Sequence, residues 1–263
     1  MILLFKSLAE LYRYRELSAT WILREINARY RQTLFGFAWA LFQPIALSIM
    51  FAIVFSFILH IPSDGAPYPL FVFSAMVPWT FFGRSLTSGI PSVAYNQDLV
   101  RKIYFPREIF PIATIASGLV DLAAGSLVFI GMMLFYRVPL RPEMLLVIVL
   151  LVIQTVFTLG IVFAGSAVNV LIRDISQVMP LLTQLWMYAT PIVYPLSLVP
   201  EKIRPFYLLN PMAVLIQGYR DLLLHQRLPD PTALATATGV ALVVFLAGYW
   251  LFKRMELHFA DFI

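Results

Sequence analysis

Cysteine and charge are what this sequence has least of, and both shortages narrow its class. None of the 263 residues is cysteine, so disulfides cannot indicate the redox state of its compartment. Asp, Glu, Lys and Arg make up 13% of the chain and hydrophobic residues 60%, whereas a soluble domain is about a quarter charged and under half apolar. A soluble core of this size would not need so much apolar surface, so the composition favours a membrane protein.

Motifs for catalysis and for metal or nucleotide binding are also missing. None of the 12 glycines is followed by lysine, which excludes the phosphate-binding loop GxxxxGK[ST]. His60, His225 and His258 are far apart in the sequence, and without cysteine or an HExxH pair they give little support for a metal site. No GxSxG nucleophile motif occurs. We therefore expect no catalytic residue, metal or cofactor on this chain, and any ATP that drives it is expected to be hydrolysed by another chain.

Long segments with almost no charge are what the sequence has instead. A helix needs roughly 20 residues to cross about 30 Å of hydrocarbon, and six segments reach that length with only Arg84 and Asp121 inside them. The sequence thus predicts an all-α integral membrane protein with one domain, 1–263, containing a bundle of six transmembrane helices over 34–252 and a tail over 253–263. The six segments are Leu34–Leu59, Tyr68 to about Val93, Ile109–Tyr136, Met144–Ile172, Ile175–Pro200 and Pro231–Phe252.

The placement of positive residues predicts the orientation. Of 19 Lys and Arg, twelve fall on the side of the N-terminus, six on the opposite side, and Arg84 lies within a span. Cytoplasmic segments carry the excess of Lys and Arg, so both termini are expected in the cytoplasm. The net charge of +5 could suggest nucleic acid, but its distribution follows the topology, so no nucleic-acid partner is expected.

Two segments outside the predicted spans have sequence patterns that indicate shorter helices. Residues 1–33 mix leucine and tryptophan with basic residues at helical spacing, which is typical of helices lying in the membrane interface; packing on a soluble partner is the alternative. Pro195, Pro200, Pro205 and Pro211 punctuate Tyr194–Asp230. Asn210-Pro211 is a helix-start signal for a helix from Met212 to about Leu224. We expect short re-entrant or interfacial helices between spans 5 and 6, with a cavity or exit beside them.

The two charges at membrane depth, Arg84 and Asp121, are candidates for function, because ionisable groups there are costly. A proton relay is one interpretation. A proton-driven carrier usually needs several coupled carboxylates, and Asp121 stands alone. Pairing of Arg84 with Asp121, or exposure to a wet cavity, is the favoured alternative.

A charged and aromatic island, NQDLVRKIYFPREIFP over Asn96–Pro111, lies between spans 2 and 3 on the predicted cytoplasmic side. Asn96 or Asp98 can cap a short helix that runs to about Tyr104, and Pro106 would end it. Taken alone, such a loop could enforce topology or contact anionic lipid. A transporter without its own ATP site also needs a contact for an ATPase, and this island is the best candidate.

Six blocks, in order and spread over essentially the whole chain, resemble one family. Together they resemble ABC-2 type permeases that export polysaccharides such as O-antigen, capsule and teichoic acid. The blocks are YRQTLFGFAWALFQPIALSIMFAIVFS (Tyr30–Ser56), YPLFVFSAMVPWTFF (Tyr68–Phe82), LVRKIYFPREIFP (Leu99–Pro111), NVLIRDISQVMP (Asn169–Pro180), PIVYPLSLVPEKIRPFYLLNP (Pro191–Pro211) and the C-terminal FADFI.

The resemblance implies a homodimer in the bacterial inner membrane that moves a lipid-linked polysaccharide along a path at the dimer centre. It also implies a cytoplasmic ABC ATPase partner, which binds the ATP and Mg and contacts the N-terminal region and the loop between spans 2 and 3. The candidate coupling residues in that loop are Asp98, Arg101, Lys102, Tyr104, Arg107 and Glu108.

Aromatic residues are candidates for lining the path, because the CH face of a sugar packs on an aromatic ring. Spans 1 and 5 are the preferred location, and aromatic residues that face lipid are the alternative. The candidates are Phe35, Trp39, Phe42, Trp79, Phe82, Trp186, Tyr188 and Tyr194.

Two other functions stay open at the level of sequence. An ABC-2 permease for small hydrophobic drugs or lipids would have the same topology. An integral-membrane glycosyltransferase or acyltransferase would need acidic or histidine clusters at one membrane face, and the outer carboxylates are spread over different loops. They are Asp64, Glu143, Glu201, Asp221 and Asp230.

Overall fold

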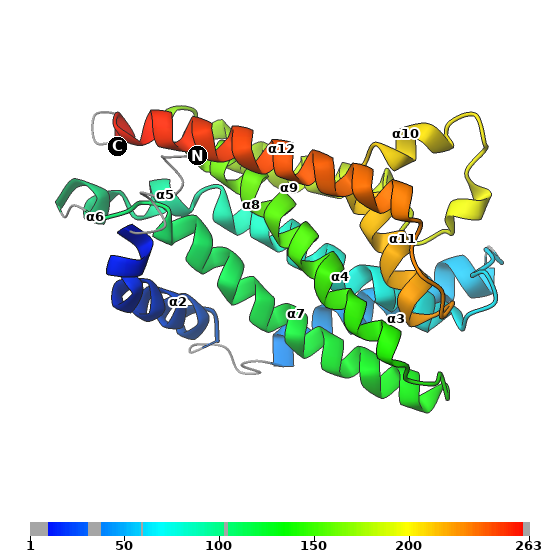
Figure 1. The fold of residues 1–263 in the computed structure, drawn as a ribbon. Coiled ribbons are helices and arrows are strands. Elements are labelled where there is room, and N and C mark those ends of the chain that lie inside the picture. Colours follow the sequence, from blue (N-terminus) through cyan, green and yellow to red (C-terminus); the bar gives the residue numbers. More distant parts are fainter. Residues whose placement is uncertain (1–9, 31–37, 59, 103–104, 260–263) are drawn as a thin grey trace.

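The computed structural model describes residues 10–30, 38–58, 60–102 and 105–259, and in these ranges the chain is helical, without strands. Helices α7 (Ile109–Phe135), α8 (Val147–Leu171) and α12 (Pro231–Glu256) run the length of the molecule (Figure 1). Helix α4 (Tyr68–Gly89) packs against α7 and α8. The expected all-α class is confirmed.

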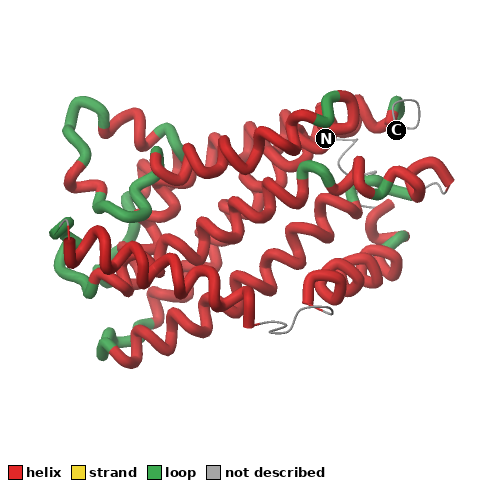
Figure 2. Tube along the Cα trace, turned by 180° about the vertical axis from the view of Figure 1, so that it is seen from behind, coloured by secondary structure: helices red, strands yellow, loops and turns green. Residues whose placement is uncertain are grey.

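Shorter elements cover the ends and one side of this bundle (Figure 2). They are α2 (Arg15–Tyr30), α3 (Ala38–Phe51) with its π-helical continuation η1 (Ala52–Ile58), α5 (Ser92–Tyr95), α6 (Gln97–Lys102), the 3₁₀ turn η2 (Pro142–Leu146), α9 (Asp174–Tyr188), the 3₁₀ turn η3 (Leu196–Leu198), α10 (Arg204–Leu208) and α11 (Pro211–Leu223).

Three helical segments among the described residues are long and apolar enough to cross a membrane: Ile109–Phe135, Pro142–Leu171 and Pro231–Glu256. They coincide with predicted spans 3, 4 and 6. Ile45–Ile58, within predicted span 1, is a shorter apolar helix. The chain is therefore a multi-pass membrane protein by length and composition, and the count of six spans stays a prediction.

The fifth predicted span is wrong in its length. The uncharged segment continues to Pro200, but α9 ends at Tyr188 after 15 residues. At 1.5 Å per residue these span about 22 Å, less than the roughly 30 Å of hydrocarbon. Pro191 and Pro195 follow. Because the α conformation is unfavourable for a residue that precedes proline, the chain continues in turns as far as η3.

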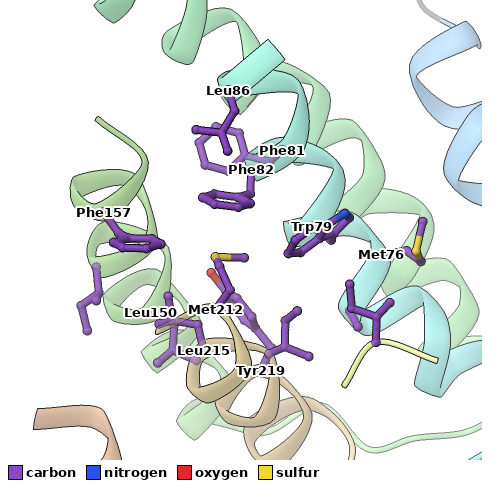
Figure 3. Packing of buried hydrophobic residues seen from close by; sticks show 14 of the residues in the cluster. Met76, Trp79, Phe81, Phe82, Leu86, Leu150, Phe157, Met212, Leu215 and Tyr219 are labelled. Atoms are coloured by element: carbon purple, nitrogen blue, oxygen red, sulfur yellow. The ribbon is translucent and has the colours of Figure 1, made fainter. Parts of the chain in front are cut away.

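The core lies where α4 meets α8 and α11 (Figure 3). Phe82 stacks on Phe157 of α8 with 5.9 Å between ring centroids, and Met212 and Tyr219 of α11 pack nearby. Lipid tails are as apolar as these side chains, so close packing holds α4 here more than removal from water does.

Two glycines allow the backbones of α8 and α12 to lie in close contact. A Cβ on Gly160 would lie 2.6 Å from the backbone of Phe245, and one on Gly248 would overlap the backbone of Gly160. Small residues of this kind let helix backbones touch inside a membrane. The pair therefore fixes α12 along α8.

The N-terminal helix α2 packs on α7. Trp21 is buried and meets Phe110 edge to face, with 5.0 Å between ring centroids, and Arg24 stacks over the Trp21 ring at 4.2 Å. The helical prediction for 1–33 holds over 10–30, while residues 1–9 and 31–33 lie outside the described ranges. The apolar face of α2 thus contacts this chain itself.

The segment between α9 and α12 forms short helices, as its sequence predicts. Helix α11 starts at Pro211, where the side chain of Asn210 accepts a hydrogen bond from the Met212 amide (3.1 Å). Helices α10 and α11 lie at one end of the bundle, whereas α2, α5, α6 and the end of α12 lie at the other (Figure 1). The short helices are thus divided between the two ends of the molecule.

Candidate functional site

Helix α6 carries the exposed part of the island. Asp98, Arg101 and Lys102 are exposed there, and none of them forms an ion pair with another described residue. The side chain of Asn96 does not cap α6; it donates to the Ser92 carbonyl of α5 (2.8 Å). The predicted helix corresponds to α6, the separate short helix α5 precedes it, and Tyr104 lies outside the described residues.

The other two coupling candidates face inward. Glu108 is fully buried, and its Oε1 lies 2.5 Å from Lys253 Nζ of α12. Lys253 also contacts Glu256 Oε2 at 2.8 Å. Arg107 donates from its guanidinium to the Glu256 carbonyl (2.5 Å) and from its amide to Glu256 Oε1 (3.2 Å). These four residues, which we call the α7–α12 clamp, fix the start of α7 to the end of α12.

Arg84 and Asp121 pair across α4 and α7, with 3.2 Å between Arg84 Nη1 and Asp121 Oδ2. The Asp121 side chain is 5% exposed and that of Arg84 is 29% exposed. The pairing expected from the sequence is thus present. This contact fits the favoured interpretation, in which the two charges pair across the helices.

The candidate path residues separate into two groups. Trp79 and Phe82 are buried in the core of the subunit, which favours a packing role. Phe42 and Tyr188 expose 59% and 52% of their surfaces, and Trp186 and Tyr194 are partly buried. Phe35 and the side chain of Trp39 lie outside what the structure describes.

A hydrogen-bonded cluster fixes the C-terminal end of α9. Trp186 Nε1 donates to Asn210 Oδ1 (3.1 Å), and Asn210 Nδ2 donates to Thr190 Oγ1 (3.0 Å). Tyr194 donates from its hydroxyl to the Tyr188 carbonyl (3.0 Å), and the same hydroxyl lies 3.0 Å from that of Tyr207. The aromatic residues at this end of α9 are therefore held in place by α10 and α11.

Sequence reasoning missed the role of Arg220. It is completely buried on α11, donates to the carbonyls of Pro191 and Ile192 (2.6 and 2.5 Å), and lies 3.6 Å over the Phe71 ring. It thereby fixes the turn after α9 to α11 and α4. In the sequence Arg220 counts only as an outer charge, because its acceptors are backbone carbonyls that leave no residue pattern.

A cavity of about 640 Å³ opens beside α11 at the same end, where the prolines predict one. It brings Asp64 together with Asp221 and Asp230, which follow it much later in the sequence. Among the described residues, no group of three or more His, Asp or Glu side chains is placed to hold a metal ion. Burial and the charge of Arg227 lower the pKa of His225, which also lines the cavity.

Comparison with known proteins gives a consistent result. The sequence model of the family described as ABC-2 type transporter matches residues 18–224. The chain is 30% identical over 258 residues to the O-antigen export system permease protein RfbA of Myxococcus xanthus, covering 97% of this chain and 98% of the relative. A protein of the same name from Klebsiella pneumoniae is 24% identical over 242 residues, covering 91% and 92%. The polysialic acid transport protein KpsM of Escherichia coli is 23% identical over 242 residues, covering 89% and 91%.

Proposed function

Because this chain belongs to the ABC-2 type transporter family, we propose that it is the membrane subunit of an ATP-driven exporter of lipid-linked polysaccharide. The observation that carries this is similarity over nearly the full length to permeases named for O-antigen export and polysialic acid transport. The lack of a phosphate-binding loop fits a subunit whose ATP and Mg are bound by a separate ATPase chain.

The proposed topology has six spans in the bacterial inner membrane, with both termini in the cytoplasm. Basic residues gather towards the end of the bundle that carries α2, α6 and the last turn of α12, where Arg101, Lys102 and Arg254 lie. The positive-inside rule makes that end cytoplasmic. The end with α10 and α11 is then the outer one.

The ATPase docks on α6 in this proposal, through Asp98, Arg101 and Lys102, with Tyr104 beside them. These charges are exposed and have no ion-pair partner within the described part of the chain. The α7–α12 clamp provides the fixed base, because it links the segment after α6 to two long helices. In this proposal Arg107 and Glu108 hold α7 to α12 and do not contact the ATPase.

Two copies of the chain enclose the path, with α3 and α9 facing the centre. Of the residues in α9 only Thr183 is buried, and both helices expose large apolar side chains, including Met50, Leu181 and Leu185. Rings of Phe42, Trp186, Tyr188 and Tyr194 are the proposed sliding surface, together with Phe35 and Trp39. Individual ring–sugar contacts are modest, so they would not trap a polymer.

Charge reversal on α6 tests the docking, with the same change at the opposite end as control. The chain is expressed with the ATPase encoded beside it in a strain that lacks both. Arg101→Glu with Lys102→Glu should abolish co-purification of the ATPase and the surface polysaccharide, whereas Lys202→Glu should change neither. Retained assembly and retained ATP hydrolysis in the double variant would refute docking through α6.

Deletion of the chain separates the proposed substrate from the alternative. Loss of surface polysaccharide with unchanged sensitivity to hydrophobic drugs is expected. Unchanged surface polysaccharide with increased drug sensitivity would instead make this an ABC-2 permease for small hydrophobic drugs or lipids.

A further inference from the structure

The cavity at the outer end has the size and the lining of a small-molecule site. Its volume of about 640 Å³ lies within the roughly 300–1,000 Å³ typical of such sites. The η3–α10 segment, α11 and the start of α12 form its walls (Figure 1). Its lining combines apolar side chains such as Leu208 and Val214 with amide, hydroxyl, carboxylate and guanidinium groups. A ligand with both CH surface and many polar groups would match it.

The charges of the cavity argue against an ion as ligand. Three carboxylates, those of Asp64, Asp221 and Asp230, face two guanidinium groups, those of Arg204 and Arg227, so an anion would meet an excess of negative charge. All three carboxylates already have partners. Asp221 pairs with Arg227 at 2.8 Å, and Asp64 accepts from the Ser197 hydroxyl at 2.9 Å. Asp230 accepts from the amide and the hydroxyl of Thr232 at 2.9 and 2.8 Å. They are thus held apart in separate contacts, in agreement with the lack of a metal cluster among the described residues.

Hydrogen-bonding capacity remains for a neutral ligand. The hydrogen bonds that other described residues make to Asp64 and Asp221 go to Oδ1, and Oδ2 of each can accept from a ligand. Arg204 keeps donors on its terminal nitrogens, since within the described part of the chain its side chain makes one long hydrogen bond, from Nη2 to the Val199 carbonyl (3.4 Å). An array of acceptors and donors at fixed positions suits adjacent hydroxyl groups, each of which both donates and accepts.

The cavity is also connected to the proposed path. Tyr207 lines it, and the hydroxyl of Tyr207 lies 3.0 Å from that of Tyr194, which in turn donates to the last residue of α9. A glycan that leaves along α9 would therefore meet this cavity next. The aromatic ring of Tyr207 adds a surface on which the CH face of a sugar can pack.

We propose that this cavity is an outer saccharide site that holds one or a few uncharged sugar residues of the emerging glycan. The inference rests on the proposed function and adds a recognition site beyond the path itself. By holding sugar hydroxyls outside the membrane, the site would oppose return of the chain between ATPase cycles.

Direct binding to the purified full-length chain in lipid nanodiscs tests the site. The probes are oligosaccharides of one to three repeat units, cleaved by mild acid from the producing strain's own surface polysaccharide, with acidic residues carboxyl-reduced. Saturation-transfer NMR and calorimetric titration report binding. Ala233→Trp fills the cavity from α12, and Thr236→Trp, exposed three residues further along the same helix, is its matched control.

We expect the wild type and Thr236→Trp to bind alike and Ala233→Trp to lose binding. Arg204→Gln should weaken binding about tenfold or more, because a hydrogen bond from a charged donor is lost, and Lys202→Gln on the same segment should not. Arg204→Gln adds no bulk, so it keeps the test valid if Ala233→Trp fails to fold.

Three results would overturn the site. The saccharide site is rejected if the wild type, Ala233→Trp and Arg204→Gln bind equally, or if the wild type does not bind. The proposed export function is tested separately, by the amount of surface polysaccharide. Inorganic phosphate or calcium that binds in the wild type but not in Ala233→Trp, with no binding of the oligosaccharide, would make the cavity an ion site instead.

Discussion

Neighbouring residues of the charged island lie in different environments. Arg101 and Lys102 are exposed on α6, whereas Glu108 is buried against Lys253. The sequence predicts all of them as one coupling surface, because the partner of Glu108 lies 145 residues away and leaves no local pattern. Residue spacing therefore identified the loop but could not distinguish its exposed residues from those of the clamp.

Breaking the clamp should cost stability without removing the docking residues. Glu108→Gln leaves Lys253 with one carboxylate fewer in a buried site, and loss of a buried partner typically costs about 3 kcal/mol. We expect a lower thermal unfolding midpoint in detergent, with the ATPase still bound by molecules that remain folded. The double variant with Lys253→Met should recover part of the loss. Additive losses in this cycle would mean that the two residues do not interact.

His225, in the cavity beside α11, should make the stability of the fold depend on pH. Burial and then the charge of Arg227 lower its pKa, against the opposing charges of Asp221 and Asp64. Below the ordinary value of about 6.5 the unfolded chain then binds more protons than the folded one, so the free energy of unfolding falls as pH falls from there to the lowered pKa.

His225→Gln should flatten this dependence, as measured by unfolding midpoints between pH 7.5 and 5. His60→Gln, at an exposed histidine of a nearby loop, is the control and should behave as the wild type. A wild-type midpoint that rises on acidification through this range would contradict the sign.

At the scale of elements, uncharged length predicted where helices lie better than where they end. The segments for α7, α8 and α12 were found within a few residues, because a long apolar run in a membrane must satisfy its backbone as a helix. The run around α9 is equally apolar but is stopped by Pro191 and Pro195, a signal that was present in the sequence. The contact of α8 with α12 could not be predicted, because glycine gives no indication of its partner.

Substitutions at two glycines of α12 test the packing of that helix. A Cβ on Gly248 would overlap the backbone of Gly160, whereas one on Gly239 would meet nothing within 4 Å. Gly248→Ala should push α12 away from α8 and lower the unfolding midpoint and the yield of folded protein. Gly239→Ala should be neutral or slightly stabilising, since alanine favours a helix by about 1 kcal/mol over glycine. Equal effects of the two changes would contradict the close contact.

At the scale of the whole molecule, the two ends of the bundle carry different short helices. Helices α5 and α6 and the end of α12 lie at one end, and α10 and α11 lie at the other (Figure 1). The α7–α12 clamp holds the end of α12, and the cavity is lined from α10 and α11. The long helices α7, α8 and α12 are the physical connection between them. One lateral face remains to be covered, because α9 exposes apolar side chains over most of its length.

Cysteine crosslinking can decide what covers that face, since the chain has no cysteine of its own. Single cysteines at Leu181, Leu182 and Leu185 on α9 are compared with Leu242→Cys on α12, whose side chain is similarly exposed. If two α9 helices face each other, oxidation in native membranes should give covalent dimers at α9 positions three or four residues apart. A disulfide requires Cα atoms within about 7 Å, so helices covered by lipid cannot form one. If only Leu242→Cys gives dimers, the interface between the two copies lies on α12, and the proposed path along α9 is wrong.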